Sequence, residues 1–311
     1  MEQKKAPGGG TQESFSFIIP AEEDGESLGR VLFRRGFSQK LLTRLKNRGG
    51  VSLDGEFHRM IDPVGSGQQV TIRWPDAEAA STGLLPAPEL AVPVVYEDDH
   101  YIIFNKPAGL AIHPCARHYH RSLGNYFAAL YPGLPFRPIG RLDKDTTGLC
   151  AVAKNGLAAA LGNQGIAKIY FAVAEGLWPE DKGSIDLPLI RIPGDTIRRE
   201  VAGEGLKAVT EYRVLRRQTA GPTASGEPGG ALTLLEVRLI TGRTHQIRAH
   251  FSHLGFPLAG DSLYGGHTRL IARQALHCGR ISLPDPAGLS PLRLICPLPP
   301  DMQLLFPGFQ L

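Results

Sequence analysis

The feature that most limits how this chain can fold is a stretch with no regular pattern, PDAEAASTGLLPAPELAV at residues 75–92. It is rich in proline, alanine and acidic residues, and its apolar positions follow the period of neither a helix nor a strand. We interpret residues 76–92 as a semi-rigid linker. The chain is therefore predicted to form two domains, at residues 14–75 and 93–311, after a disordered lead at 1–13. A region of about 60 residues is small but can fold alone.

Composition is that of a soluble globular protein, with 42% hydrophobic and 21% charged residues. No run reaches the roughly 18 consecutive apolar residues that a membrane span needs. The N-terminus lacks the apolar segment of a secretory signal. The cysteines are far apart and form no C-x-x-C pair, which favours reduced thiols in a cytosolic protein and argues against a zinc ribbon or a disulfide framework. They are Cys115, Cys150, Cys278 and Cys296.

Positive charge is concentrated in residues 26–48, where seven Lys and Arg stand against a single Glu. Apolar residues at helical spacing predict two short helices, the second beginning after Ser38 and ending at Gly49. The cations fall mostly on the faces away from these apolar residues. A strand, a tight turn at Asp54 and Gly55, and two further strands are predicted to follow. We therefore expect a small α/β module with a basic helical surface.

The larger region mixes strands and helices without the regular alternation that a parallel βαβ sheet requires. Apolar strands are predicted on either side of a turn at Asp98 and Asp99, and residues 123–131 have a helical pattern. Residues 208–215 and 231–240 alternate like two paired antiparallel strands. We predict an α+β fold, in which a mixed, mainly antiparallel sheet flanked by helices follows the small module.

The segment GRLDKDTTGLCAVAKN, residues 140–155, sets charges of both signs directly before a predicted buried strand. Asp143 and Asp145 are two residues apart and face the same side of an extended segment. An isolated pair of this kind is most often a solvated turn. Here the following residues are small enough for tight packing, so an Asp at this junction is partly desolvated. It then needs a cation or several N–H donors to remain ionised.

Residues 239–265 place many polar side chains at the start of a predicted helix. Ile247, Phe251 and Leu254 are expected to form its apolar face, with Thr244 as the N-cap. The segment also contains three histidines. Their spacings of five and three residues do not gather them on one helix face, which argues against a metal site.

Arg243 and Arg248 are the odder feature of this segment, because positive charge near a helix N-terminus opposes the helix dipole. An anionic partner is expected, either Asp143 or a phosphate. Arg248 is flanked by core-facing Ile247 and is predicted to point inward, where a buried arginine must be paired. We predict a contact within about 4 Å between its guanidinium and the Asp143 carboxylate. Arg243 follows the turn and is expected to meet a phosphate or backbone carbonyls.

A third segment is the strand AKIYFAVAEG at residues 167–176, in which a tyrosine is usually a packing residue. Together the three segments resemble the pseudouridine synthases of the RluA type, over residues 93 to about 300. The family's first signature is matched by Arg141, Leu142, Asp143, Thr147, Gly148, Ala153 and Lys154. Its second, a Lys-x-Tyr-x-Ala strand, is matched by Lys168, Tyr170 and Ala172, and its third by residues 241–265. The histidine that usually precedes the Arg-Leu-Asp of the family is replaced here by Gly140.

Residues 14–75 resemble the small RNA-binding module first known from a ribosomal small-subunit protein, the S-four-like fold, which often precedes this catalytic domain. The resemblance implies that the basic helices contact RNA phosphates. The residues concerned are Arg34, Arg35, Lys40, Arg44, Lys46 and Arg48.

The family resemblance implies that the chain isomerises specific uridines in structured RNA to pseudouridine by base flipping and an Asp-dependent rearrangement of the glycosidic bond. Asp143 is then the catalytic carboxylate, with Tyr170 and Arg248 beside it. The RNA-contacting residues of the same site would be Arg141, which fills the space of the flipped base, Arg243 and His245. Because no redox step or external energy is involved, no cofactor and no metal are expected. Ribosomal RNA is favoured as the substrate over transfer RNA, and a cytoplasmic monomer is expected.

Two other classes of function stay open at this point. One is a non-catalytic RNA-binding or ribosome-assembly factor, against which the joint presence of Asp143, Tyr170 and Arg248 argues. The other is a metal-dependent hydrolase, against which the absence of a carboxylate–histidine cluster on one face argues. Sequence also leaves open whether Asp143 attacks the sugar, attacks the base or only removes a proton.

Overall fold

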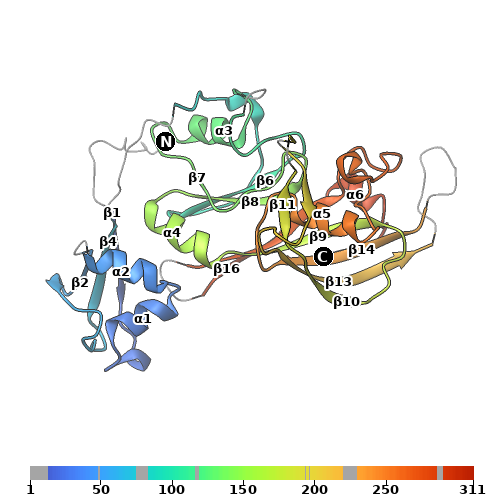
Figure 1. Ribbon diagram of the computed structural model, residues 1–311. Helices are drawn as coiled ribbons and strands as arrows, with labels where there is room; N and C mark the ends of the chain where they lie inside the picture. The colour runs from blue at the N-terminus through green and yellow to red at the C-terminus, as the bar shows by residue number, and fades with distance from the viewer. Residues whose placement is uncertain are drawn as a thin grey trace.

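The computed structural model describes residues 13–47, 50–74, 83–115, 119–192, 194–195, 197–219, 230–285 and 290–311. Nearly all of the predicted lead, Arg48, Gly49 and the first part of the predicted linker lie outside these ranges. Figure 1 shows the N-terminal elements, in blue, as a separate body at one end of the molecule, next to α4 (Gly156–Gly165). The larger region is built on one long sheet.

The N-terminal module is an antiparallel sheet in the order β1-β4-β2-β3, packed with two short helices around a hydrophobic core to which α4 also contributes. Its elements are β1 (Glu13–Ile18), α1 (Leu28–Arg34), α2 (Gln39–Asn47), β2 (Val51–Leu53), β3 (Glu56–Phe57) and β4 (Gln69–Trp74), with a short 3-10 turn at η1 (Ala21–Glu23). The predicted N-cap is confirmed, because the Ser38 hydroxyl accepts from the Leu41 amide at 3.3 Å. The predicted tight turn is confirmed as well, with Asp54 and Gly55 both at positive φ.

The large sheet contains ten strands within the described residues, and its neighbours are antiparallel with one exception. Side by side lie β10 (Lys182–Asp186), β13 (Val209–Gln218), β14 (Leu232–Leu239), β9 (Ala167–Glu175), β15 (Leu276–Leu283), β8 (Thr147–Ala153), β6 (Tyr101–Lys106) and β5 (Val94–Glu97). In addition β16 (Leu292–Ile295) pairs with β15, and β7 (Arg137–Pro138) pairs with β8. The exception is the parallel pair of β15 and β8. The predicted mixed, mainly antiparallel sheet is thus confirmed.

Short helices and one small hairpin flank this sheet (Figure 1). The helices are α3 (Leu123–Leu130), α4, α5 (Gln246–His253) and α6 (Pro300–Gln303), with 3-10 turns at η2 (Pro88–Leu90) and η3 (Ser262–Tyr264). The hairpin joins β11 (Leu189–Arg191) to β12 (Arg199–Val201). Side chains of Ser122 and Asn155 cap α3 and α4. None of the described helices is long and apolar enough to pass through a bilayer.

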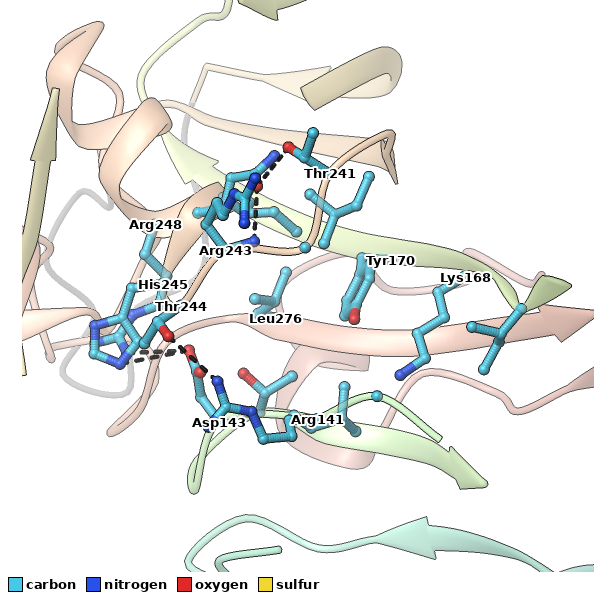
Figure 2. A pocket seen from close by; sticks show the side chains of 18 of the residues that line it. Arg141, Asp143, Lys168, Tyr170, Thr241, Arg243, Thr244, His245, Arg248 and Leu276 are labelled. Carbon is cyan, nitrogen blue, oxygen red and sulfur yellow. Dashed lines mark hydrogen bonds and ion pairs between the residues drawn. The ribbon is translucent and has the colours of Figure 1, made fainter. Parts of the chain in front are cut away.

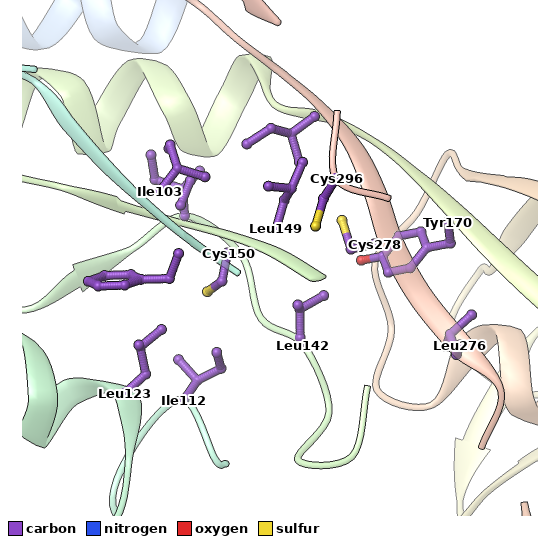
Figure 3. Packing of buried hydrophobic residues seen from close by; sticks show 14 of the residues in the cluster. Ile103, Ile112, Leu123, Leu142, Leu149, Cys150, Tyr170, Leu276, Cys278 and Cys296 are labelled. Atoms are coloured by element: carbon purple, nitrogen blue, oxygen red, sulfur yellow. The ribbon is translucent and has the colours of Figure 1, made fainter. Parts of the chain in front are cut away.

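Strand β8 explains why charges stand directly before small apolar residues in residues 140–155. All seven of its residues are buried, since β6 and β15 flank it and the core covers it. Figure 3 shows Leu149 and Cys150 of this strand among the packed side chains. A β-carbon at Gly148 would lie 2.3 Å from the Cys278 carbonyl oxygen, so only glycine permits the close parallel pairing with β15. This pairing carries the charged loop to the end of two central strands.

The described part of the predicted linker, residues 83–92, is not a free connection. Ala87 and Val92 are buried, at 3% and 2% exposure. The side-chain amide of Asn125 in α3 donates to the Leu85 carbonyl at 2.8 Å, and the Ala87 amide donates to the Asn125 carbonyl at 3.1 Å. Val92 lies in the core of the larger domain, and Leu84 lies beside α3, where a β-carbon at Gly124 would be 3.2 Å from its Cδ1. This segment therefore belongs to the larger domain.

Candidate active site

A cavity of about 540 Å³ opens beside the charged loop, and it is lined by five segments far apart in sequence. Its walls come from the loop 140–146, the C-terminal end of α4, the first half of β9, the turn that leads into α5, and Leu276 of β15. Figure 2 shows residues of the loop, β9, the turn and β15 around it. Cavities of this size accept a small molecule or a nucleotide. The three segments that the sequence singled out thus meet at one place.

Asp143 lies in the wall of this cavity with 24% of its side chain exposed. The guanidinium Nη1 of Arg248 donates to its Oδ2 at 3.3 Å, so the predicted contact within about 4 Å is confirmed. The Nε2 of His245 lies 3.8 Å from the same oxygen. Figure 2 shows both side chains pointing at the carboxylate from the α5 side. A carboxylate in this position has cationic support on one side and open space on the other.

A second carboxylate, Asp261, holds Arg248 more tightly than Asp143 does, and sequence reasoning missed it. Arg248 donates through Nε at 2.7 Å and through Nη2 at 2.8 Å to the two oxygens of Asp261, which is 1% exposed on its side chain. The guanidinium also lies 5.0 Å from the centre of the Tyr264 ring. A buried arginine has five N–H donors, and the single carboxylate of Asp143 cannot accept from all of them. This surplus of donors is the signal that could have found Asp261.

His245 lies inside the cavity rather than on an outer surface. It is the N-cap of α5 with φ of 54°, a left-handed conformation that is uncommon for a non-glycine residue, so the prediction of Thr244 as the cap is wrong. Its Nδ1 lies 3.1 Å from the Tyr264 hydroxyl. Burial lowers the pKa of His245, and the nearby Asp143 only partly opposes this. A neutral imidazole therefore stands between the aromatic hydroxyl and the carboxylate. Backbone strain of this kind is concentrated at functional sites.

Tyr170 supplies an aromatic wall to the same cavity. It lies in β9, is 5% exposed and faces the cavity together with Lys168 (Figure 2). Burial raises the pKa of the Tyr170 hydroxyl well above its ordinary value. The hydroxyl is therefore protonated at neutral pH and is unsuited to act as a base, whereas its ring is suited to stacking.

Gly140, the departure from the family pattern, has a structural explanation. Its φ of 72° lies in the region that glycine adopts without strain. A β-carbon at this position would lie 2.6 Å from the Nζ of Lys168, which donates to the Ile139 carbonyl at 3.2 Å. In this protein the lysine ammonium thus occupies the space into which a side chain at position 140 would extend.

A fully buried lysine fixes the loop that carries Asp143 through hydrogen bonds to backbone carbonyls. Lys106 is 0% exposed, and its Nζ donates to the carbonyls of Lys144, Leu110 and Pro107 at 2.7, 2.8 and 2.9 Å. Burial lowers the pKa of Lys106 to about 8. The sequence pattern gave no role to this lysine, because its three acceptors are backbone atoms.

Asp145 has a structural place in the same loop. Its Oδ1 accepts from the Gly109 amide at 3.1 Å. Its carbonyl accepts from Nη1 of Arg273 at 3.2 Å, and Arg273 is itself paired with Asp301 of α6. These contacts fix the backbone on the C-terminal side of Asp143.

The two arginines at the rim of the cavity keep exposed positions suited to RNA. Arg141 reaches across to the Thr244 hydroxyl at 3.5 Å (Figure 2). Arg243 donates through Nε to the Lys207 carbonyl at 3.1 Å, in agreement with its expected contact to a backbone carbonyl. Within the described residues neither guanidinium is paired with a carboxylate, so both can turn toward an anion.

In the N-terminal module the predicted phosphate contacts divide into two groups. Arg34, Lys40, Arg44 and Lys46 are exposed. Arg35 is buried, paired with Glu23 at 2.7 Å and stacked 4.2 Å from the Phe17 ring centre, so its assignment as an RNA contact is wrong. The module needs this arginine to satisfy a buried carboxylate.

The histidines of α5 do not gather into a metal site. His250 is buried between the Thr210 hydroxyl at 3.0 Å and the Leu187 carbonyl at 2.8 Å. Within the part of the chain that the structure describes, no three His, Cys, Asp or Glu side chains are grouped to hold a metal ion.

The cavity combines exposed arginines at its rim, an arginine-paired carboxylate and an aromatic side chain, which suits an enzyme whose substrate is anionic and carries a flat ring. Two solved structures share the fold: human RNA pseudouridylate synthase domain containing 1 and domain containing 4. Their TM-scores are 0.54 and 0.51 at 24% and 23% identity, covering 70% and 68% of this chain and 88% and 90% of theirs.

Sequence comparison agrees with this class. The family described as RNA pseudouridylate synthase matches residues 100–253. The chain is 35% identical to the ribosomal large subunit pseudouridine synthase D of Pseudomonas aeruginosa, over 91% of this chain and 92% of that protein. It is 34% identical to an uncharacterized RNA pseudouridine synthase, YjbO, of Bacillus subtilis, over 88% and 95% of the two chains.

The chain therefore belongs to the RNA pseudouridylate synthase family. It is an isomerase that converts uridine in RNA to pseudouridine. This activity replaces the two alternatives that the sequence left open, the non-catalytic factor and the metal-dependent hydrolase.

Proposed function

We propose that this protein modifies uridines of large-subunit ribosomal RNA in the cytoplasm, as a monomer and without metal or cofactor, and that Asp143 is its catalytic carboxylate. The name of the Pseudomonas aeruginosa relative supports the choice of RNA. The single observation that carries the proposal is the position of Asp143, which shares Arg248 with a buried carboxylate yet faces the cavity. Arg248 then acts as a positioning residue for this carboxylate.

The reaction breaks the C1′–N1 bond of uridine, turns the uracil and joins C1′ to C5. A proton leaves C5 and N1 gains one, so atoms and electrons balance without an added reactant. The target base is extruded from the RNA stack into the cavity. Positive charge develops on C1′ as in glycoside cleavage, and the ionised Asp143 stabilises it. Tyr170 supports the uracil face by stacking, while Arg141 fills the space that the base leaves.

The test uses RNA tritiated at uridine C5, transcribed as unmodified large-subunit ribosomal RNA. Formation of the new C1′–C5 bond releases that tritium to water, and no hydrolysis does so. The proposal predicts release from this RNA and little from transfer RNA transcripts. Preferential release from transfer RNA would contradict the proposed substrate while leaving the isomerase activity in place.

The N-terminal module is proposed to be an S-four-like RNA-binding domain that holds phosphates through Lys40, Arg44 and Lys46. The exposure of these cations on α2 supports the proposal. Replacing Lys40 and Lys46 by alanine should lower the log–log salt slope of RNA binding by about 2, close to one unit for each lost phosphate contact. An unchanged slope would show that this helix does not contact RNA.

A further inference from the structure

Helix α4 belongs to two cores at once. Leu157 and Leu161, one helical turn apart, are 3% and 0% exposed and pack into the hydrophobic core of the N-terminal module. Ala158, on another face of the same helix, packs into the core of the large sheet. In Figure 1 the helix lies between the blue module and the sheet. The module is therefore seated on the catalytic domain through apolar burial and is not merely tethered to it.

Pro284, directly after β15, forms a wedge between the two domains. A β-carbon at Gly165, the last residue of α4, would lie 2.4 Å from its Cγ, and one at Gly36, just after α1, would lie 3.7 Å from its Cβ. Both glycines thus face the same proline ring. The Pro284 carbonyl accepts from the Tyr101 hydroxyl at 2.9 Å, which anchors the wedge to β6. The turn between α1 and α2 is thereby brought next to the end of α4.

The same end of α4 forms one wall of the cavity. Asn163 and Gln164 line it, and both are exposed. Their amides can donate to and accept from the edges of bases. Next to these amides, Gly165 lies against Pro284, and Pro284 lies against Gly36, four residues before the exposed Lys40.

We propose that this docking joins the basic face of α2, the end of α4 and the cavity into one continuous surface for a single structured RNA. On it, Asn163 and Gln164 contact nucleotides that flank the target uridine. The proposal rests on the proposed function. Because the spacing is fixed by packing, only an RNA with phosphates and target at matching separation engages both regions, and the second contact becomes intramolecular.

The test compares the full chain with a variant in which Leu157 and Leu161 are replaced by glutamine, so that the docking face becomes polar. Its matched control is Leu304→Gln, at a leucine that is 70% exposed. Small-angle scattering should give a larger radius of gyration for the double variant alone. Tritium release from unmodified large-subunit ribosomal RNA should show kcat/KM lowered about tenfold or more, with KM carrying the loss and kcat nearly retained.

A second variant is needed because replacing two core leucines can itself prevent folding. Pro284→Gly removes the wedge from outside both cores and should change scattering and KM in the same direction, by a smaller factor. Replacing Asn163 and Gln164 together by alanine should raise KM about threefold to tenfold without any change in scattering. Gln303→Ala, at an exposed glutamine of α6, is the control for that variant.

Expansion of the leucine variant with unchanged KM would overturn the continuous surface, because a tethered module would then suffice. Unchanged scattering in both docking variants would overturn the docking itself. If the wild-type chain releases no tritium from this RNA, the proposed substrate fails. The inference is then decided separately, by scattering and by whether the docking variants bind the same RNA about tenfold more weakly in filter binding.

Discussion

Arg35 in the N-terminal module and Arg248 in the catalytic domain are both buried and both paired with carboxylates, yet only one of them borders a cavity. The Arg35 side chain is 5% exposed, and its partner Glu23 is 10% exposed. Arg248 is 8% exposed, but its two partners differ, with Asp261 at 1% and Asp143 at 24%. The first pair is closed, whereas the second leaves one carboxylate facing the substrate space.

The difference teaches that burial of an ion pair does not by itself indicate function. Desolvation offsets much of the attraction within a buried pair, so such a pair is weak support for either stability or chemistry. The pair of Arg248 and Asp143 is different, because the arginine is buried while the carboxylate is partly exposed. Asp143 is oriented by the protein and still reachable by a ligand.

Among the variants that test this comparison, Asp143→Asn is expected to lose the most activity. The change keeps the shape and removes the charge, so tritium release should fall by more than about a thousandfold while RNA binding stays nearly intact. Asp145→Asn is the matched control, because Asp145 serves the turn and asparagine can still accept from the Gly109 amide. Residual activity of Asp143→Asn within about tenfold of wild type, roughly 1.4 kcal/mol, would sink the assignment.

Arg248→Ala and Arg35→Ala test the two pairs directly. Arg248→Ala leaves the buried Asp261 without its cation, so it should lower the free energy of unfolding by about 3–5 kcal/mol, measured in urea. Arg35→Ala should cost less, because Arg34 lies 3.5 Å from the same Glu23 carboxylate. Only Arg248→Ala should also abolish most of the tritium release by folded protein. Arg248→Lys should recover charge but not the forked geometry. Equal loss of activity in both alanine variants would show that the comparison is mistaken.

Substitutions of Tyr170 test whether the cavity that Asp143 faces binds the base by stacking. Tyr170→Phe keeps the ring and should bind RNA like wild type, whereas Tyr170→Ala should weaken binding by about 1–3 kcal/mol. Affinity measured at one fixed salt concentration checks both. Indistinguishable binding by all three proteins would remove Tyr170 from the base pocket.

Lys106 offers the smallest effect and a third kind of buried cation, one that donates to three backbone carbonyls. Burial lowers the pKa of Lys106 to about 8 from its ordinary value of 10.5. Between these pH values the unfolded chain binds more protons, so the contribution of Lys106 to the free energy of unfolding rises with pH. The slope is at most about 1.4 kcal/mol per pH unit.

Urea unfolding at pH 7.5 to 9.5 checks this prediction by comparing wild type with Lys106→Met. The stability of wild type should increase relative to the variant as pH rises, although the variant is less stable throughout. Lys182→Met, at an exposed lysine, should follow wild type. Parallel curves for wild type and Lys106→Met would mean that Lys106 does not titrate in this range.

Much of the fold was predictable because its signals are local. The caps at Ser38, the turn at Asp54, and the paired strands β13 and β14 depend on residues close together in sequence. The Asp143–Arg248 contact was also predictable, although 105 residues separate the two, because an inward arginine must find an acid and the family resemblance pointed to the same pair. That argument identified one acid and missed the second.

By itself the sequence determined the order of the elements, the class of sheet and the three segments that carry the chemistry. Only the tertiary structure decided which charges are buried together, that Asp261 holds Arg248, that Glu23 withdraws Arg35 from the surface, and that α4 joins two cores. The physical reason is that helical and strand periods act over a few residues. The pairing of buried charges and apolar faces depends on which distant surfaces meet, and no local pattern records that.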